Sequence, residues 1–170
     1  MYAGAGIVLF TPDFRLLLVQ DAKSKKWGFS KGHREPEETS EIGTAQRELL
    51  EETGIPPTAY TIYEHPFRII RGSSSYVFYY AIMNTMEYAG RIQCRGEISG
   101  LLWIPLMQFF LTPAAIDGNK YLRTWIDDIT THADRKTNTT LQALIGRVFG
   151  GGAAQSQEAP ASPTSSAGSG

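Results

Sequence analysis

One long helical segment stands between groups of strand-like segments, and this order constrains the fold of the chain more than any other feature. The helical window covers residues 39–53. Apolar runs typical of strands precede it at residues 3–10 and 15–20, and runs rich in aromatic and β-branched residues follow at 60–70, 76–83 and 101–104. The pattern predicts an α/β domain with a mixed sheet rather than a regular alternation of strands and helices.

Two further helices are predicted near the C-terminus, where apolar residues recur at three- and four-residue steps. The recurring residues are Leu122, Trp125, Ile126 and Ile129, then Leu141, Leu144, Ile145 and Val148. We expect both helices to pack on the sheet, so that residues 1–149 form one layered domain. Residues 150–170 are mainly Gly, Ala, Ser, Pro and Gln, and we expect them to form a disordered low-complexity tail.

The composition argues against several classes of protein. The chain has 16 Lys and Arg against 17 Asp and Glu, so its net charge gives no general attraction to nucleic acid or anionic lipid. Cys94 is the single cysteine and cannot form an internal disulfide, and three scattered histidines offer no zinc-ligand spacing. No apolar run approaches the roughly 20 residues that span a bilayer. We therefore expect a cytoplasmic protein without a membrane partner.

The helical window carries an unusual acidic face in its second half, residues 47–55. At about 100° per residue, an apolar stripe forms along one side of the helix. The stripe consists of Ile42, Ala45 and Leu49. Glu48 and Glu52 border this stripe and Glu51 follows next around the helix, so these carboxylates are expected to be crowded and partly buried. Like charges at such spacings repel, and a cation is therefore expected among them.

The chemistry of this face favours magnesium. Hard carboxylate oxygens, without His or Cys nearby, suit an ion that keeps water and phosphate in its remaining coordination positions. Gly54 just past the acidic turn is a plausible helix end, and Thr39 or Ser40 a plausible N-cap. The alternative is a surface helix with a solvated acidic cluster, which a bare Glu-x-x-Glu-Glu would favour.

The segment from Gly32 to Ile55 resembles the Nudix box, G-x5-E-x7-R-E-U-x-E-E-x-G-U with U aliphatic. Gly32 and Glu38 fit its first half, and the second half fits from Arg47 onward. Eight residues separate Glu38 from Arg47 where the family has seven. We expect the extra residue around positions 39–41, because inside the helix it would rotate one half against the other by about 100°. Glu37, Glu38 or Glu41 could supply the carboxylate that pairs with the box arginine.

The resemblance implies a Nudix-type α/β/α sandwich and a Mg²⁺- or Mn²⁺-dependent hydrolase. It assigns Glu48 and Glu52 as metal ligands, Glu51 as a further ligand or water holder, and Arg47 as the residue that orients them. The backbone carbonyl of Lys31 often completes such a site. An acidic residue beyond the box usually serves as ligand or base, and Glu97 is our candidate. The general base is then Glu48 or Glu97.

The substrate is suggested by residues 27–36, which are similar to the Trp-x-x-Pro-Lys-Gly-His-x-Glu-Pro stretch of asymmetrical diadenosine tetraphosphate hydrolases, with Ser30 in the proline place. The likeness implies hydrolysis of a phosphoanhydride bond in a nucleoside-diphosphate-linked small molecule. Our candidate substrate-binding residues are Lys31, His33, Trp27 and Tyr76. The aromatic side chains equally fit a packing role.

Several alternatives stay open. The substrate could be a diphosphoinositol polyphosphate or the cap of a messenger RNA, the one nucleic-acid partner that we expect to be possible. The domain could also be a catalytically silent Nudix-like binding module, or a partner-binding subunit. The sequence retains all four charged residues in the second half of the box, which argues against a catalytically silent module: Arg47, Glu48, Glu51 and Glu52.

Overall fold

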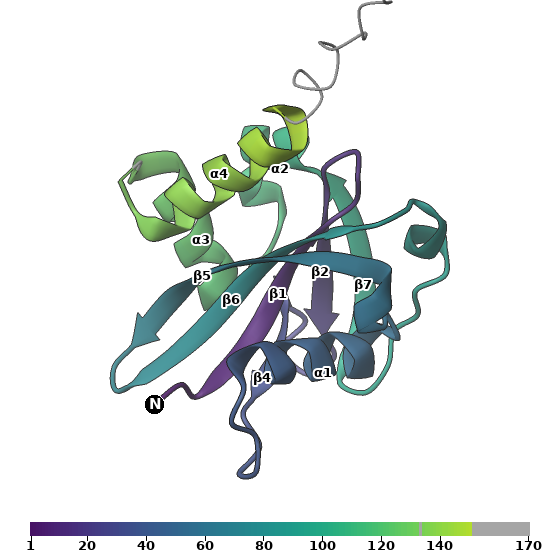
Figure 1. Cartoon of the computed structure of the whole chain (residues 1–170), viewed down its shortest axis with the longest axis vertical. Helices are drawn as coiled ribbons and strands as arrows, with labels where there is room; N and C mark the ends of the chain where they lie inside the picture. Colours follow the sequence, from purple (N-terminus) through teal and green to yellow (C-terminus); the bar gives the residue numbers. More distant parts are fainter. Residues whose placement is uncertain (133, 151–170) are drawn as a thin grey trace, which may run out of the picture.

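A mixed sheet of seven strands forms the middle layer of the molecule (Figure 1). The strands are β1 (Gly4–Phe10), β2 (Arg15–Asp21), β3 (Trp27–Gly28), β4 (Ser30–His33), β5 (Tyr60–Arg71), β6 (Ser74–Met83) and β7 (Ile98–Pro105). They follow the order β3-β2-β1-β6-β5, while β4 pairs with β1 and β7 with β2. The β1–β6 pair is parallel and the other pairs are antiparallel, so the predicted mixed sheet is confirmed.

The computed structural model describes residues 1–132 and 134–150 of the chain. The expected low-complexity tail therefore lies, apart from Gly150, outside the described residues. No helix in the described part of the chain is both long and apolar enough to cross a membrane.

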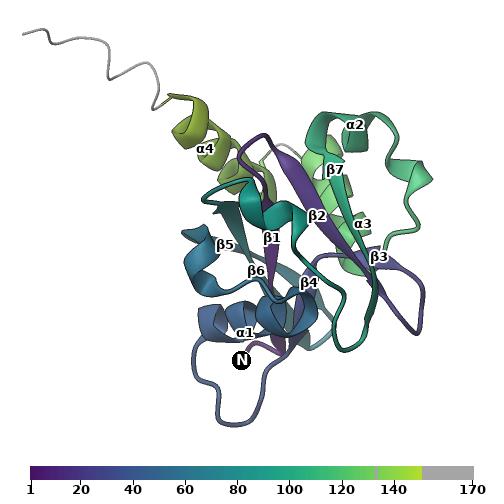
Figure 2. The ribbon, with the colours of Figure 1, turned by 90° about the vertical axis from the view of Figure 1, so that its right-hand side faces the viewer.

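Helices cover both faces of the sheet (Figures 1 and 2). They are α1 (Glu41–Thr53), α2 (Leu106–Leu111), α3 (Lys120–Thr131) and α4 (Lys136–Gly150), with short 3₁₀ turns at Pro57–Ala59, Glu87–Gly90 and Pro113–Ala115. One apolar cluster joins α1 to the sheet through Ala45 and Leu49, both fully buried. A second cluster on the other face contains residues of α2, α3 and α4, including Trp125 and Leu141. This is the predicted α/β/α sandwich.

Two strands and one helix were not predicted. Ser30–His33 carries no apolar alternation, and it forms β4 because its backbone pairs with β1 from Gly4 to Ile7. The two-residue strand β3 is likewise defined by its pairing with β2. Helix α2 is six residues long, too short for a helical period to show in the sequence.

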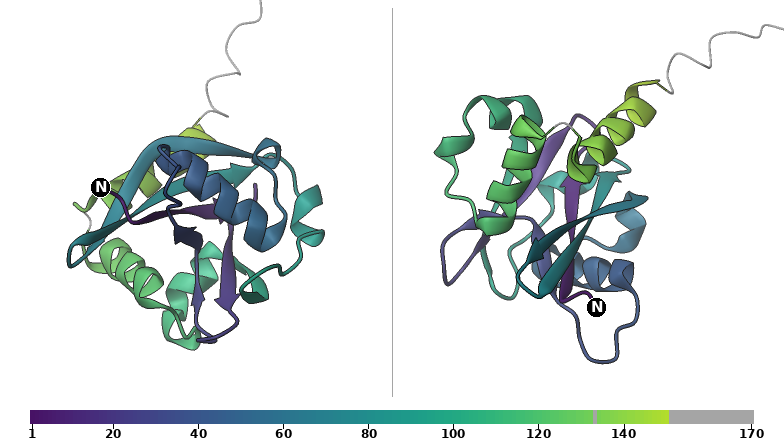
Figure 3. Two further views of the ribbon diagram at one scale, coloured as in Figure 1. Left: turned by 90° about the horizontal axis from the view of Figure 1, so that it is seen from below. Right: turned by 90° about the vertical axis from the view of Figure 1, so that its left-hand side faces the viewer.

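The acidic helix α1 begins and ends at the predicted residues. The Ser40 side chain accepts a hydrogen bond from the Gly43 N–H, and Gly54 ends the helix in the left-handed conformation with φ 76°, where its N–H bonds to the Leu50 carbonyl. Because α1 is continuous from Glu41 to Thr53, the additional residue of the box is accommodated in the preceding loop, residues 34–40. Figure 3 shows this loop beside the N-terminal end of β1.

Candidate active site

A cleft of about 580 Å³ opens between β4, α1 and the start of β7. Its acidic lining residues are Asp21, Glu35, Glu48, Glu51, Glu52 and Glu97, and its basic ones are Lys26, Lys31, Arg34 and Arg47. The fold thus brings the box residues together with Glu97, which lies 45 positions beyond Glu52 in the sequence (97 − 52). The predicted catalytic set shares one cleft.

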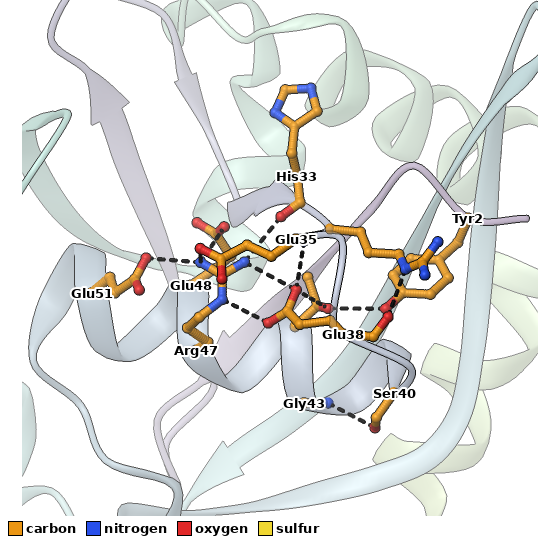
Figure 4. A network of polar contacts seen from close by, with 11 residues as sticks. Tyr2, His33, Glu35, Glu38, Ser40, Gly43, Arg47, Glu48 and Glu51 are labelled. Carbon is orange, nitrogen blue, oxygen red and sulfur yellow. Dashed lines mark hydrogen bonds and ion pairs between the residues drawn. The ribbon is translucent and has the colours of Figure 1, made fainter.

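Arg47 is the centre of a charged network in this cleft (Figure 4). Its Nε donates to Glu38 Oε1 at 2.7 Å, and its Nη1 lies 2.9 Å from both Glu48 Oε1 and Glu51 Oε2. Its Nη2 donates to the His33 carbonyl at 2.9 Å and to Glu38 Oε2 at 3.3 Å. The five N–H donors of the guanidinium therefore face five acceptor atoms, which fixes its orientation.

Glu38 supplies the carboxylate that pairs with Arg47, despite the extra residue of the box. The hydrogen bond from Arg47 is the largest of the effects that lower the pKa of Glu38 to about 2. Glu41 instead pairs with Arg68 on β5 at 2.7 Å. The question that the sequence left open among the three acidic residues is settled in favour of Glu38.

Glu52 is a partly buried carboxylate with one buried oxygen atom, Oε2, that has no hydrogen-bond partner in the described residues. Burial, reinforced by the neighbouring charge of Glu48, raises the pKa of Glu52 to about 7, although Ser30 and Lys31 act in the opposite direction. Burial also raises the pKa of Glu48, whose side chain is only 13% exposed. The predicted partial burial is confirmed for Glu48 and Glu52. It is wrong for Glu51, whose side chain is 55% exposed because it lies further around the helix from the apolar stripe.

Lys31 faces these carboxylates from β4. Burial lowers the pKa of its ammonium group, while Glu52 and Glu48 raise it. The Nζ atom lies 5.0 Å from the ring centre of Tyr121 and 5.6 Å from that of Tyr76, within the range of cation–π contacts. The Lys31 side chain therefore lines the cleft beside two aromatic rings and the two glutamates.

Gly32 gives the Glu48 carboxylate its space. A Cβ atom added at Gly32 would collide with the Glu48 carboxyl group. The glycine of the box thus has a local steric reason, because any side chain at this position of β4 would displace Glu48 from its place.

The residues present fit a magnesium or manganese ion. Among the described residues, no three His, Cys, Asp or Glu side chains converge closely enough to hold an ion by themselves. Mg²⁺ is commonly bound by one or two carboxylates, with water and substrate phosphate in its other positions, so a closed set of protein ligands is not required. The unpartnered oxygen of Glu52, beside the buried Glu48, meets this description.

The other predicted site residues divide into two groups. Glu97 and His33 line the cleft, and within the described part of the chain Glu97 forms no ion pair. Trp27 and Tyr76 are not among the lining residues; Tyr76 is 6% exposed and packs edge-on against His33, with ring centres 5.9 Å apart. Tyr76 therefore sits behind the cleft surface, and Trp27, which is partly exposed, lies outside the lining of the cleft.

Sequence reasoning missed Asn119, Lys26 and Asp21, which line the cleft. Asn119 caps α3 and reaches the cleft because its backbone N–H bonds to the Trp27 carbonyl, a contact without any local sequence signal. It also missed Thr44, which contacts Glu38. For Thr44 a signal exists, since it lies three and four residues before Arg47 and Glu48 on the same helix face.

The fold and the site define a class of protein. A sequence profile described as the NUDIX domain matches residues 2–126. This region is most of the chain, and the protein therefore belongs to the NUDIX family.

Particular relatives were found by sequence and by structure. Over 65 residues the chain is 40% identical to an RNA pyrophosphohydrolase of Zymomonas mobilis, an alignment that covers 37% of this chain and 41% of that protein. An Ap4A hydrolase of C. elegans, solved as a binary complex, superposes with a TM-score of 0.61 at 20% identity, covering 86% of this chain and 98% of that one.

A further structure is the NUDIX domain of Shewanella oneidensis NrtR complexed with ADP ribose. It superposes with a TM-score of 0.54 at 23% identity and covers 75% of this chain and 84% of that domain. At these identities the two structural matches establish the shared fold. The sequence match spans less than half of the RNA pyrophosphohydrolase.

Proposed function

We propose that this protein is a divalent-metal-dependent hydrolase that cuts a phosphoanhydride bond in a dinucleoside polyphosphate such as diadenosine tetraphosphate. The observation that carries the proposal is Glu52, whose buried Oε2 lacks a partner in a cleft that also contains Glu48 and the Lys31 ammonium. A buried carboxylate oxygen that has no hydrogen bond within the described residues is stabilised by a cation or a proton.

The roles of the protein groups follow from their positions. Glu48 and Glu52, with Glu51 and the carbonyl of Lys31, would hold Mg²⁺ or Mn²⁺. Such an ion, when bound, neutralises phosphate charge and lowers the pKa of water. Arg47 keeps Glu48 and Glu51 in place through its contacts at 2.9 Å.

Proton transfer is assigned to a glutamate at the edge of the metal-binding face. Glu97 lines the same cleft and has no ion pair in the described residues, so its carboxylate is free to accept a proton from water. Glu48 is the alternative base, although the Arg47 guanidinium lies 2.9 Å from its carboxylate. The Lys31 ammonium would pair with a phosphate oxygen as a point charge.

The substrate class rests on two supports. Residues 27–36 are similar to the corresponding stretch of asymmetrical diadenosine tetraphosphate hydrolases, and the C. elegans Ap4A hydrolase shares the fold over nearly its whole length. The partial match to the RNA pyrophosphohydrolase supports a second candidate, a triphosphorylated or capped RNA end.

A substrate panel tests the proposal. Purified protein with Mg²⁺ or Mn²⁺ is incubated with diadenosine tetraphosphate, ADP-ribose, triphosphorylated RNA, capped RNA and a diphosphoinositol polyphosphate, and the products are identified by chromatography. We expect ATP and AMP from diadenosine tetraphosphate at the highest kcat/KM. Preference for an RNA end would select the second candidate. Tight binding of a nucleotide without turnover of any compound would instead indicate a silent binding module.

A further inference from the structure

The loop that carries Glu38 is not a regular element, and Tyr2 contacts both its first residue, Arg34, and Thr44 of the helix that follows it. At the start of the loop, the Arg34 guanidinium lies 5.5 Å from the centre of the Tyr2 ring, and the Arg34 N–H bonds to the Ala3 carbonyl. Beyond its end, the Tyr2 hydroxyl lies 3.0 Å from Thr44 Oγ1 in α1. The Tyr2 side chain therefore connects the loop to the helix (Figure 4).

The direction of the hydrogen bonds follows from the number of protons available. Thr44 Oγ1 donates to Glu38 Oε2 at 2.7 Å, because a carboxylate paired with Arg47 can only accept. A hydroxyl has one proton, so Thr44 must accept from Tyr2. The donation runs from Tyr2 through Thr44 to Glu38, and the same carboxylate accepts from Arg47, which contacts Glu48 and Glu51.

Thr44 has no other evident reason to occupy its position. Its side chain is fully buried in the first turn of α1, and in a helix a β-branched residue is less favourable than alanine. Within the described part of the chain, the Thr44 hydroxyl forms hydrogen bonds with Tyr2 and Glu38 alone. A buried polar group that disfavours the helix locally is expected to have a specific task.

We propose that Tyr2 and Thr44 are positioning residues that hold Glu38 against Arg47 and, through Arg47, set the orientation of the metal-binding glutamates. The loop contains the additional residue of the box and has one internal backbone bond, from the Glu38 N–H to the Glu35 carbonyl. Two side-chain bonds hold it from within, from Arg34 Nε to the Glu38 carbonyl and from the Glu35 N–H to Glu38 Oε2. Tyr2 and Thr44 add the connection from Glu38 to α1 and the N-terminal segment. The catalytic consequence rests on the hydrolase function proposed above. The expected order of the Arg47 side chain does not depend on that function.

Loss of the hydrogen bonds from Tyr2 to Thr44 and from Thr44 to Glu38 should make the orientation of the Arg47 side chain less fixed without unfolding the domain. Residues that orient metal ligands from outside typically affect metal affinity or activity by 10- to 100-fold. For Thr44→Val, which keeps the side-chain shape, we expect kcat to fall about tenfold and the Mg²⁺ concentration for half-activation to rise about tenfold. KM for the substrate should change less than threefold, since neither Tyr2 nor Thr44 lines the cleft.

The experiment compares Thr44→Val, Thr44→Ser and Tyr2→Phe with the unmodified protein. Thr44→Ser keeps the hydroxyl and should restore both kcat and Mg²⁺ activation. Tyr60→Phe is the matched control, because the Tyr60 hydroxyl is also buried in the α1-side cluster but makes no hydrogen bond in the described residues. A loss of melting temperature common to Thr44→Val and Tyr60→Phe would reflect packing alone.

A readout that needs neither metal nor substrate separates this inference from the proposed function. The Arg47 Nε–H should exchange slowly with water because of its 2.7 Å bond to Glu38, and it can be followed by NMR in the metal-free protein. We expect exchange to accelerate at least tenfold in Thr44→Val and Tyr2→Phe, and not in Thr44→Ser or Tyr60→Phe. Unchanged exchange in both test variants would overturn the inference, whatever the activity. Accelerated exchange without any hydrolase activity would leave the positioning role intact and refute the proposed function. If Thr44→Val does not fold, Tyr2→Phe decides the matter.

Discussion

Glu52→Gln is the sharpest test of the site, because it removes one charge and leaves the size of the side chain nearly unchanged. If Glu52 is a principal metal ligand, turnover at saturating Mg²⁺ should fall by roughly 10² or more, the scale of losing one major electrostatic contributor. The rate is measured with the preferred substrate of the panel. Near-full activity in the variant would refute the assignment of Glu52 as a ligand.

Glu52→Gln should lower turnover, but at neutral and higher pH it should raise the free energy of unfolding of the metal-free protein relative to the unmodified one. The pKa of Glu52 is raised from 4.5 to about 7 in the folded protein. The folded state therefore binds more protons than the unfolded state between these values, and the free energy of unfolding of the unmodified protein falls as the pH rises through this window. Each pKa unit corresponds to about 1.4 kcal/mol, which gives a loss of about 3 kcal/mol once Glu52 is ionised.

Glutamine has no charge to lose, so its stability relative to the unmodified protein should improve as the pH rises. Part of the gain is offset by the buried amide, which costs about 1–3 kcal/mol if its N–H groups stay unpaired. The difference between the two proteins should nevertheless shift by about 2–3 kcal/mol between pH 5 and pH 8, or several degrees in melting temperature. A difference that does not change with pH would show that Glu52 is not a buried charge.

Glu41→Gln is the matched control on the same helix. Glu41 pairs with Arg68 rather than with Arg47, and it does not line the cleft. Its ion pair is partly exposed, so the loss should cost no more than about 1 kcal/mol of stability and leave turnover within about twofold. A large loss of activity in Glu41→Gln would show that a charge anywhere on α1 affects turnover. It would contradict the assignment of Glu52 as a ligand from its position on the helix.

Four further results are expected. Gly32→Ala should fold, since the clashing carboxyl group ends a flexible side chain, yet lose at least about tenfold in turnover because Glu48 is displaced, as activity and melting curves would show. Glu97→Gln should lower kcat by about 10² or more if Glu97 is the base, and a full rate would leave that role to Glu48. Exhaustive chelation should abolish turnover. Mg²⁺ binding at pH 6, followed by calorimetry in two buffers, should release close to one proton, and release should largely vanish at pH 8.5, because Glu52 must give up its proton to bind the ion.

The elements with a strong period could be predicted from the sequence, and those formed by long-range pairing could not. The apolar stripe and the caps of α1 gave its position to within two residues, because Ser40 and Gly54 satisfy the helix ends locally. β4 was missed because its residues are polar and its strand exists only through pairing with β1. Residue patterns within a segment thus predicted α1, whereas β4 depends on contacts with a distant part of the chain.

The candidate site shows the same limit. The spacing of Arg47, Glu48 and Glu52 on one helix determines which face they share, and a motif with fixed spacing can report it. The choice of Glu38 over Glu37 or Glu41 depends on the path of a loop, and the loop is held by Tyr2 and Arg34 through contacts that no spacing rule includes. Trp27 and Tyr76 could not be placed in or behind the cleft from their residue types alone.

The charges of the site suggest why one divalent ion fits it. Glu38, Glu48, Glu51 and Glu52 carry four negative charges when ionised, and Arg47 and Lys31 supply two positive ones, which leaves two negative charges uncompensated within this cluster (−4 + 2 = −2). Arg47 directly contacts the first three carboxylates, so the deficit falls on Glu52, and this agrees with its raised pKa and its unpartnered oxygen. A proton at Glu52 removes half of the deficit and one Mg²⁺ removes all of it. If Glu52 is the metal ligand that we propose, the proton and the ion compete for it, whereas Glu38, Glu48 and Glu51 are held by their contacts with Arg47.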